Sequence, residues 1–313
     1  MPRPRDGYRQ AVVVIVNFFA SLPMKRALKC GISMVVFAAS AIGMGLGRLT
    51  GRKRKGLCVV LYYHSVPAEL RGEFARQLDV VLQKAKTIGV ADRVSLEQSN
   101  LYAAVTFDDA FENFVDVALP ELTKRNIPST VFVIADALGK TFGPAGHAER
   151  VMSARQLQAL PEDLVTIGSH TSTHPYLPSL NESDAKQELA ESRVKIEQIL
   201  NRKVQLFSFP FGGFNSELVE HCREVGYRRV FTTLPEFAFE NPEQFVVGRV
   251  RVDPSDWSIE FRLKLAGAYR WLPIAFSMKR KIVQNRFVGR LFGSQNRPDS
   301  ESSPRSKIHE LPA

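Results

Sequence analysis

Between residues 57 and 257, short apolar runs alternate with longer amphipathic stretches. The apolar runs are rich in β-branched and aromatic residues, as strands are, and the stretches between them have a helical period. The predicted strands are 57–63, 102–107, 129–134, 164–168, 205–209, 229–233 and 245–250. The predicted helices between them include 72–88, 111–125, 182–200 and 215–226.

This alternation predicts an α/β fold with about seven parallel strands joined by helical crossovers. Such a sheet is either a distorted (β/α)7 barrel or a doubly wound sheet, and in both cases ligands bind at the carboxyl ends of the strands. The residues that directly follow each predicted strand are therefore the first place to look for chemistry.

The N-terminal part of the chain has a different pattern. Residues 30–47 form a run of 18 residues without a charge, just long enough to cross a bilayer. We therefore predict that residues 1–56 are a membrane-associated or membrane-spanning segment. Three basic residues before the run and five after it favour the cytoplasmic side for the catalytic part. A cleaved signal peptide ending near Ala39-Ser40-Ala41 is the alternative.

The C-terminal part is also distinct. Residues 258–293 read as a basic amphipathic helical extension, broken near Pro273. Residues 294–313 are polar and are predicted to be a disordered tail. These boundaries leave residues 57–257 as the predicted catalytic domain.

The net charge of +10 is unevenly distributed. Residues 1–56 contain 11 basic residues and one acid, whereas residues 57–257 contain 20 basic and 27 acidic residues, a net charge of −7. This balance argues against a nucleic-acid groove in the catalytic part. Basic ends interleaved with apolar residues suit an anionic lipid surface, so we expect a membrane partner and no nucleic acid. The three cysteines predict no disulfide framework.

Two strand ends together carry the donors of a metal site. The strand at 102–107 ends in Asp108 and Asp109, and the strand at 164–168 is followed by His170 and His174. The aspartates alone could be the start of a capping box with Glu112. Two imidazoles and one carboxylate, however, are a three-ligand set that leaves a coordination position open for water, as a hydrolytic metal centre requires. The second carboxylate is then available as a base.

Two further strand ends add candidate groups. The strand at 205–209 runs into Pro210-Phe211-Gly212-Gly213, where glycines permit close backbone approach to a ligand. The strand at 57–63 is followed by His64. Either feature alone would be an ordinary loop or a structural histidine. We expect all four strand ends to converge on one face of the fold.

These motifs resemble those of the polysaccharide deacetylase family, also called carbohydrate esterase family 4, across roughly residues 57–255. The matching segments, in chain order, are Thr106-Phe107-Asp108-Asp109, then His170-Thr171-Ser172-Thr173-His174, then Phe209-Pro210-Phe211-Gly212. The resemblance implies a distorted barrel in which Asp108 is the base and a divalent metal, commonly zinc, is bound by Asp109, His170 and His174.

The resemblance also implies roles for two groups outside the metal ligands. The loop Pro210-Phe211-Gly212 would contact the substrate, with the backbone N–H of Phe211 facing the oxyanion. The segment Leu61-Tyr62-Tyr63-His64-Ser65-Val66 is similar to the branch that includes poly-N-acetylglucosamine deacetylases, where such a histidine can be the general acid.

Some positions depart from the family pattern. Ala110 stands where the family usually has Gly, and Ser208 where many members have an Arg that positions the base. Arg249 or Arg251 could replace that Arg. The family's leucine-x-histidine motif is missing, and Asp253-Pro254-Ser255-Asp256-Trp257 reads either as the family's aspartate-tryptophan motif or as a helix start before Ile259.

The sequence therefore predicts a metal-dependent hydrolase that uses metal-activated water to remove N-acetyl groups from an amino-sugar polysaccharide or oligosaccharide. Two alternatives stay open: a catalytically silent glycan-binding protein of the same fold, and an O-acetyl esterase. The oligomeric state is not predicted.

Overall fold

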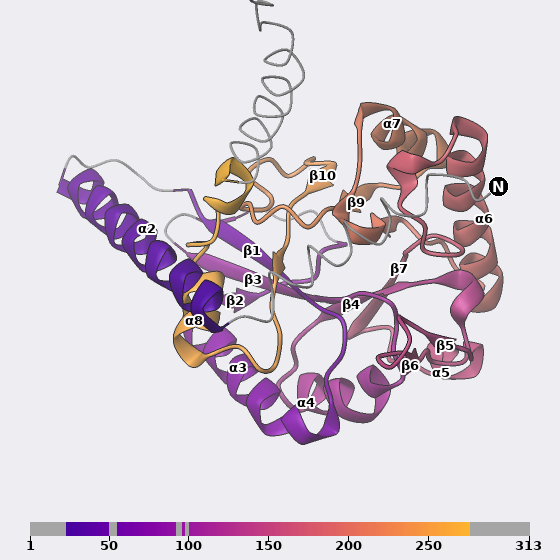
Figure 1. Ribbon diagram of the computed structural model, residues 1–313, viewed down its shortest axis with the longest axis horizontal. Coiled ribbons are helices and arrows are strands. Elements are labelled where there is room, and N and C mark those ends of the chain that lie inside the picture. Colours follow the sequence, from indigo (N-terminus) through magenta and orange to yellow (C-terminus); the bar gives the residue numbers. More distant parts are fainter. Residues whose placement is uncertain (1–22, 50–54, 92–95, 98–99, 276–313) are drawn as a thin grey trace, which may run out of the picture. The chain divides into compact units, whose positions relative to one another are not determined.

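The computed structural model describes residues 23–49, 55–91, 96–97 and 100–275, and those up to Trp271 form one compact unit (Figure 1). Residues 1–22 of the predicted membrane segment lie outside the described residues. So do most of the predicted C-terminal extension, from residue 276, and the tail from residue 294.

The centre of the fold is a nine-stranded sheet in which every strand pair is parallel. Its strands are β1 (Leu57–Tyr63), β2 (Lys86–Thr87), β3 (Leu101–Phe107), β4 (Ser129–Val133), β7 (Val165–Ser169), β8 (Leu206–Ser208), β9 (Arg229–Phe231), β10 (Val246–Val247) and β11 (Val250–Arg251). The order is β10-β9-β8-β7-β4-β3-β1-β11, and β2 pairs with β3 outside this path. Parallel strands of this kind confirm the predicted α/β class.

The sheet curls into a distorted barrel because its two end strands are neighbours in the sequence. The segment predicted as one strand, 245–250, is in fact two: β10 lies at one end of the strand order and β11 at the other. Only Gly248 and Arg249 separate them, and three peptide units span at most about 11 Å. The two edges of the sheet must therefore approach each other at this seam.

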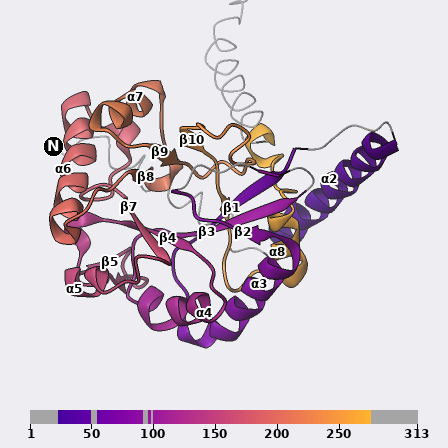
Figure 2. The ribbon, with the colours of Figure 1, turned by 180° about the vertical axis from the view of Figure 1, so that it is seen from behind.

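Helices cover the outside of the curled sheet (Figures 1 and 2). They are α3 (Arg71–Lys84), α4 (Leu119–Lys124), α5 (Ala154–Gln158), α6 (Glu182–Leu200) and α7 (Ser216–Val225). A large apolar cluster joins strand residues such as Val59 and Leu61 to helix residues such as Leu78 and Leu189. The alternate strand residues, including Cys58 and Val60, form a second cluster inside the barrel.

Two predicted helices differ from the structure at their ends. The helix predicted at 72–88 ends at Lys84, since Lys86–Thr87 pairs with β3 as β2. The helix predicted at 111–125 is irregular, with a π-helical turn at Phe114–Ala118 before α4. By contrast, α6 coincides with the prediction.

Two further helices within the described residues lie together on the outside of the unit. Helix α2 (Pro23–Leu49) contains the predicted apolar run, and its part Met24–Gly43 is long and apolar enough to cross a membrane. It packs against α8 (Ser258–Leu265). All three cysteines are free and buried, in agreement with the absence of a disulfide framework.

Candidate metal centre and active site

The chain turns sharply where β3 ends, and this turn separates two adjacent carboxylates. Asp109 and Ala110 both have left-handed backbone conformations, with φ of 69° and 56°. Ala110 thus adopts a conformation that Gly takes without strain, which accounts for the usual Gly of the family at this position. The next helical turn begins only at Phe114, so Asp109 is not the N-cap of a capping box.

The two histidines lie on an irregular loop after β7. The backbone N–H of His170 donates to the Val133 carbonyl, which prolongs the pairing with β4, and His174 has a φ of 62°. Glu188 of α6 holds the loop between them: its carboxylate accepts from the backbone N–H groups of Ser172 and Thr173 at 2.8 and 3.0 Å. As the proline at 175 predicts, the pair is not part of a regular helix.

The fold brings Asp109, His170 and His174 to one point. Their ligand atoms lie within 4.8 Å of one another, and Asp109 Oδ1 is 3.6 Å from Nε2 of His170 and 3.5 Å from Nε2 of His174. Ligand atoms bound tetrahedrally at about 2.1 Å from a zinc ion would be about 3.4 Å apart. The arrangement therefore has the size of a metal site.

The chemistry of the three groups also fits a divalent cation. Asp109 Oδ1 is buried without a hydrogen-bond partner among the described residues. Burial, then the nearby charges of Asp108 and Glu149, raise the pKa of Asp109 to about 8, and the positive charge of Arg249 offsets this rise only in part. Burial lowers the pKa of His174 to about 3 and also lowers that of His170, which keeps both imidazoles neutral, as metal ligands are.

His170 is held in the orientation that a ligand needs. Its Nδ1 lies 2.7 Å from the Ser208 carbonyl and donates to it, so the lone pair on Nε2 faces Asp109. Ser208 thus contributes to the site through its backbone.

Asp108 is bound by Arg249, a residue from the seam of the barrel. Arg249 is fully buried, and its guanidinium donates to both carboxylate oxygens of Asp108, at 2.7 and 2.8 Å. It also donates to the Ser208 hydroxyl at 2.7 Å. Burial alone would raise the pKa of Asp108, but the charge and hydrogen bonds of Arg249 outweigh it and lower the pKa to about 2.

Of the two arginines that could replace the family Arg, the structure thus selects Arg249, whereas Arg251 is exposed. Ser208, at the family's Arg position, leaves room for this guanidinium and accepts one of its hydrogen bonds. The sequence signal is shared by both arginines, because each interrupts the apolar run 245–252. Only the fold shows that Arg249 is the buried one.

His64 follows β1, with its ring 5.6 Å from that of Tyr62. Burial lowers its pKa to about 4, while the negative charge of Asp108 acts in the opposite direction. The imidazole therefore lies within electrostatic reach of the proposed base.

Phe211 lies beside the metal-ligand set on the turn after β8. Its backbone has a φ of 58°, its side chain is 59% exposed, and its ring centroid is 4.7 Å from that of His174. The turn is closed by the N–H of Gly212, which donates to the Phe209 carbonyl. A side chain at Gly212 would overlap Thr233, so close packing requires glycine here.

A short hairpin that the sequence analysis missed forms another wall of the site. It consists of β5 (Thr141–Phe142) and β6 (Glu149–Arg150), and the Phe142 ring lies 5.2 Å from that of His174. Glu149 accepts hydrogen bonds from Ser65 at 2.7 Å and from Asn113 at 2.5 Å. Strands of two residues have no period that a sequence can reveal.

Two other features are separate from this site. Asp256, in the turn directly before α8, pairs with Lys264 of that helix at 2.7 Å. This ion pair favours the structural interpretation of the aspartate-tryptophan segment.

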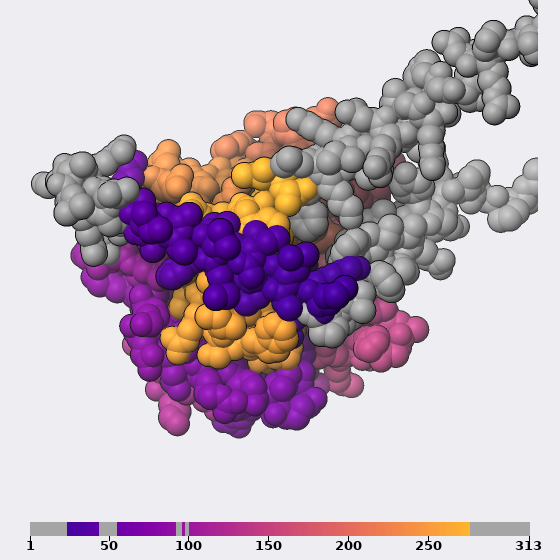
Figure 3. All heavy atoms as spheres, turned by 60° about the vertical axis from the view of Figure 1, so that its left-hand side comes forward, coloured from indigo at the N-terminus to yellow at the C-terminus, as the bar shows by residue number. Residues whose placement is uncertain are grey.

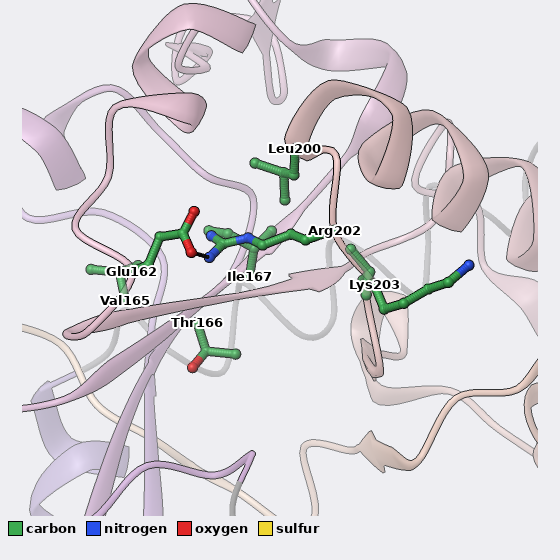
Figure 4. Close-up of a pocket in the computed structure, with 8 residues that line it drawn as sticks. Glu162, Val165, Thr166, Ile167, Leu200, Arg202 and Lys203 are labelled. Carbon is green, nitrogen blue, oxygen red and sulfur yellow. Dashed lines mark ion pairs between the residues drawn. The ribbon is translucent and has the colours of Figure 1, made fainter.

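A hollow of about 110 Å³ lies at the start of β7, which is the end of the strand opposite to His170. The Arg202–Glu162 ion pair crosses this hollow (Figure 4).

Comparison with known proteins agrees with this geometry. Residues 97–230 match the family model "Polysaccharide deacetylase". The chain is 27% identical over 157 residues to the poly-beta-1,6-N-acetyl-D-glucosamine N-deacetylase of Staphylococcus epidermidis, a match that covers 47% of this chain and 53% of that protein. It is 28% identical over 150 residues to the Bacillus subtilis protein YxkH, whose name assigns it to the same family, with 48% and 51% covered. The chain thus spans about half the length of these curated relatives.

The fold has a close counterpart among solved structures. IcaB from Ammonifex degensii superimposes with a TM-score of 0.59 at 26% identity, covering 69% of this chain and 98% of that one. The parallel barrel, the convergent strand ends and the family match lead to the same result: this chain contains a polysaccharide deacetylase domain, matched over residues 97–230.

Proposed function

We propose that this chain is a metal-dependent N-deacetylase that hydrolyses acetamide groups on an amino-sugar polysaccharide or oligosaccharide. The observation that carries the proposal is the pairing of two unlike carboxylates at one strand end. Asp109 faces two imidazoles without a hydrogen-bond partner for its Oδ1 among the described residues, and Asp108 is kept ionised by Arg249.

Asp109, His170 and His174 would hold the divalent metal, and two nitrogen donors with one carboxylate oxygen suit zinc. When bound, such a metal polarises a carbonyl group and makes water nucleophilic at neutral pH. Asp108 would accept the proton of that water at a carboxylate oxygen, and the backbone N–H of Phe211 would donate to the oxygen on which negative charge develops.

His64 would donate a proton to the leaving amine. Its pKa of about 4 means that the imidazole is uncharged at neutral pH in the substrate-free enzyme. The acid role therefore requires that it gain a proton after the substrate binds. The products would be acetate and a free amino sugar.

An amino-sugar substrate is supported by the surroundings of the site and by the relatives. Phe211, whose ring contacts that of His174, and Tyr176 are both at least half exposed. Their ring centroids are 6.5 Å apart, and such rings offer flat apolar surfaces to a sugar. The S. epidermidis relative is named for N-acetyl-D-glucosamine N-deacetylation. We further propose that the basic, apolar N-terminal part associates with a lipid surface, where such a polymer could be made or exported.

The central test is acetate release from N-acetylglucosamine oligomers by the zinc-loaded protein. We expect activity that Asp108→Asn abolishes with the metal still bound, whereas Asp109→Asn loses both activity and metal. Asp116→Asn, at an exposed position on the π-helical turn, is the matched control. Full activity in Asp108→Asn would contradict the proposed base.

The same assay separates the two alternatives. Glycan binding without acetate release would indicate a catalytically silent glycan-binding protein. Faster turnover of O-acetyl than of matched N-acetyl sugars would indicate an esterase.

A further inference from the structure

Helix α2 has two opposite faces with different environments. Met24, Leu28, Val35 and Ile42 follow each other at spacings of four, seven and seven residues, which places them on one stripe of the helix. Their exposed fractions are 80%, 64%, 69% and 65%. An apolar stripe this exposed on a described helix requires a partner or an apolar phase.

On the opposite face, the first part of α2 is attached to the folded unit, whereas Phe37, further along the same face, is 43% exposed. Arg26, Cys30 and Ser33 lie roughly half a turn away from the stripe at 100° per residue. Cys30 and Ser33 are buried, and Ser33 accepts a hydrogen bond from the indole of Trp271 at 2.9 Å. Figure 3 shows α2, in indigo, lying against α8.

The attachment is a partly buried group of charges. Arg26 donates to Glu260 at 2.5 Å and to the Ser255 carbonyl at 2.8 Å, and its guanidinium lies 4.6 Å from the Trp257 ring centroid. Lys264 joins the group by pairing with Glu260 at 3.0 Å, where both side chains are at most 10% exposed. These contacts hold the first third of α2 to α8, so this part of the helix is fixed to the surface of the unit.

This attachment conflicts with a helix that crosses a bilayer. Arg26 is bound to α8, and the chain re-enters the same unit at Leu57, so both ends of α2 are on one side. If the helix spanned, the eight peptide units after Leu49, at most about 29 Å long, would have to recross a core of about 30 Å. This segment includes Arg52 and Lys53. Its charged side chains and unpaired backbone polar groups would be exposed to the hydrocarbon core, which is energetically too costly.

We infer that α2 is a one-sided membrane anchor that stays attached to α8 and lies in the headgroup region of an anionic bilayer, with the stripe Met24–Leu28–Val35–Ile42 facing the acyl chains. The choice of an anionic lipid follows from charge, because residues 1–56 contain 11 basic residues and one acid. The inference rests on the lipid contact proposed above and not on hydrolysis.

Depth measurements on the full chain test this geometry. Single cysteines at positions 28, 35 and 42, in a Cys30→Ala background, would carry an environment-sensitive fluorophore, and the native Cys58 and Cys222 are fully buried. With phosphatidylglycerol–phosphatidylcholine vesicles and lipids that carry quenchers at known depths, we expect all three positions to report the same shallow depth. A markedly deeper position 35, as in a helix that spans with its middle near residue 34, would overturn the inference.

Two variants test the stripe and the attachment. Leu28→Ser with Val35→Ser and Ile42→Ser should bind these vesicles at least about tenfold more weakly, since each position loses a lipid-facing side chain. Leu82→Ser with Val194→Ser, which removes exposed apolar side chains elsewhere, should bind normally. Arg26→Ala should move position 35 deeper by releasing the helix.

Each contrary result has a distinct meaning. No fluorescence change with vesicles would overturn the lipid contact itself while leaving deacetylation untouched, because acetate release is measured separately. The unaltered chain could form dimers in the absence of vesicles, and the stripe variant could be monomeric while still binding vesicles normally. That result would assign the stripe to contact with a second copy of the chain. An unchanged depth in Arg26→Ala would overturn the role of the attachment to α8.

Discussion

Single residues in this site depend on partners that are distant in the sequence. Arg249 is 141 positions from Asp108, yet it binds both oxygens of that carboxylate. Its guanidinium carbon also lies 4.6 Å from the ring centroid of Tyr62 and 5.2 Å from that of Phe132. A planar guanidinium can make two parallel hydrogen bonds to a carboxylate, whereas an ammonium group acts as a point charge. The state of Asp108 therefore depends on the shape of its partner as well as on the charge.

Arg249→Lys is expected to lower the turnover rate by about 10- to 100-fold while zinc content stays unchanged, because only the orientation of Asp108 is disturbed. Arg251→Lys, two positions further along at an exposed site, is the matched control. Steady-state acetate release and metal analysis check both variants. A simultaneous loss of zinc would show that Arg249 supports the ligands and not the base.

The unpartnered Asp109 Oδ1 leads to a prediction that needs no substrate. A zinc concentration 100 times the dissociation constant should stabilise the folded chain by about 2.7 kcal/mol. For a domain of this size that corresponds to a rise in melting temperature of about 5–10 °C. Asp109→Asn should remove the rise and Asp116→Asn should keep it, as followed by thermal unfolding with and without a chelator. A rise that persists in Asp109→Asn would place the zinc elsewhere.

At the scale of elements, the sequence predicted those parts whose signals are local. Helix α6 was predicted with its observed ends because Asn181 caps its first turn and Asn201 ends it with a φ of 51°. The motifs after β3 and β7 were also visible, since Asp108 and His170, their first residues, directly follow the strands. The hairpin β5–β6 was missed because strands of two residues show no period in the sequence. The split of 245–250 was missed because it depends on pairing with strands far along the chain.

Helix α6 also positions the histidine loop, through Glu188. Its carboxylate accepts three hydrogen bonds from Ser172 and Thr173, including one at 2.6 Å from the Thr173 hydroxyl. Glu188→Ala should weaken zinc binding by about 10- to 100-fold, since the loop that carries His174 loses its attachment to α6. Glu191→Ala is the control on the same helix, where the carboxylate pairs with Lys195 and not with the loop. Equal zinc affinities in the two variants, measured by competition with a chelator, would contradict this role.

At the scale of the whole molecule, closure of the barrel and assembly of the site are one event. The seam between β10 and β11 carries Arg249, so the strands that close the sheet also bring the guanidinium to Asp108. The apolar cluster inside the barrel also reaches this seam, because the Phe231 ring centroid lies 5.8 Å from the guanidinium carbon of Arg249. Any change that widens the seam should therefore reduce stability and activity together.

Gly248→Ala tests this coupling. A Cβ at Gly248 would lie 2.4 Å from the Leu234 carbonyl oxygen and 2.9 Å from the Glu236 side chain, so the seam must shift to accommodate it. Overpacking of this kind is expected to cost about 1–3 kcal/mol of unfolding free energy, measured by urea denaturation. Acetate release should fall in the folded variant, because Arg249 moves with its neighbour. Gly72→Ala, where the nearest atom is a side-chain nitrogen at 3.8 Å, should leave both quantities unchanged or slightly raise stability. Lost stability with normal turnover would mean that Arg249 keeps its place when the seam opens, and that closure and catalysis are separate.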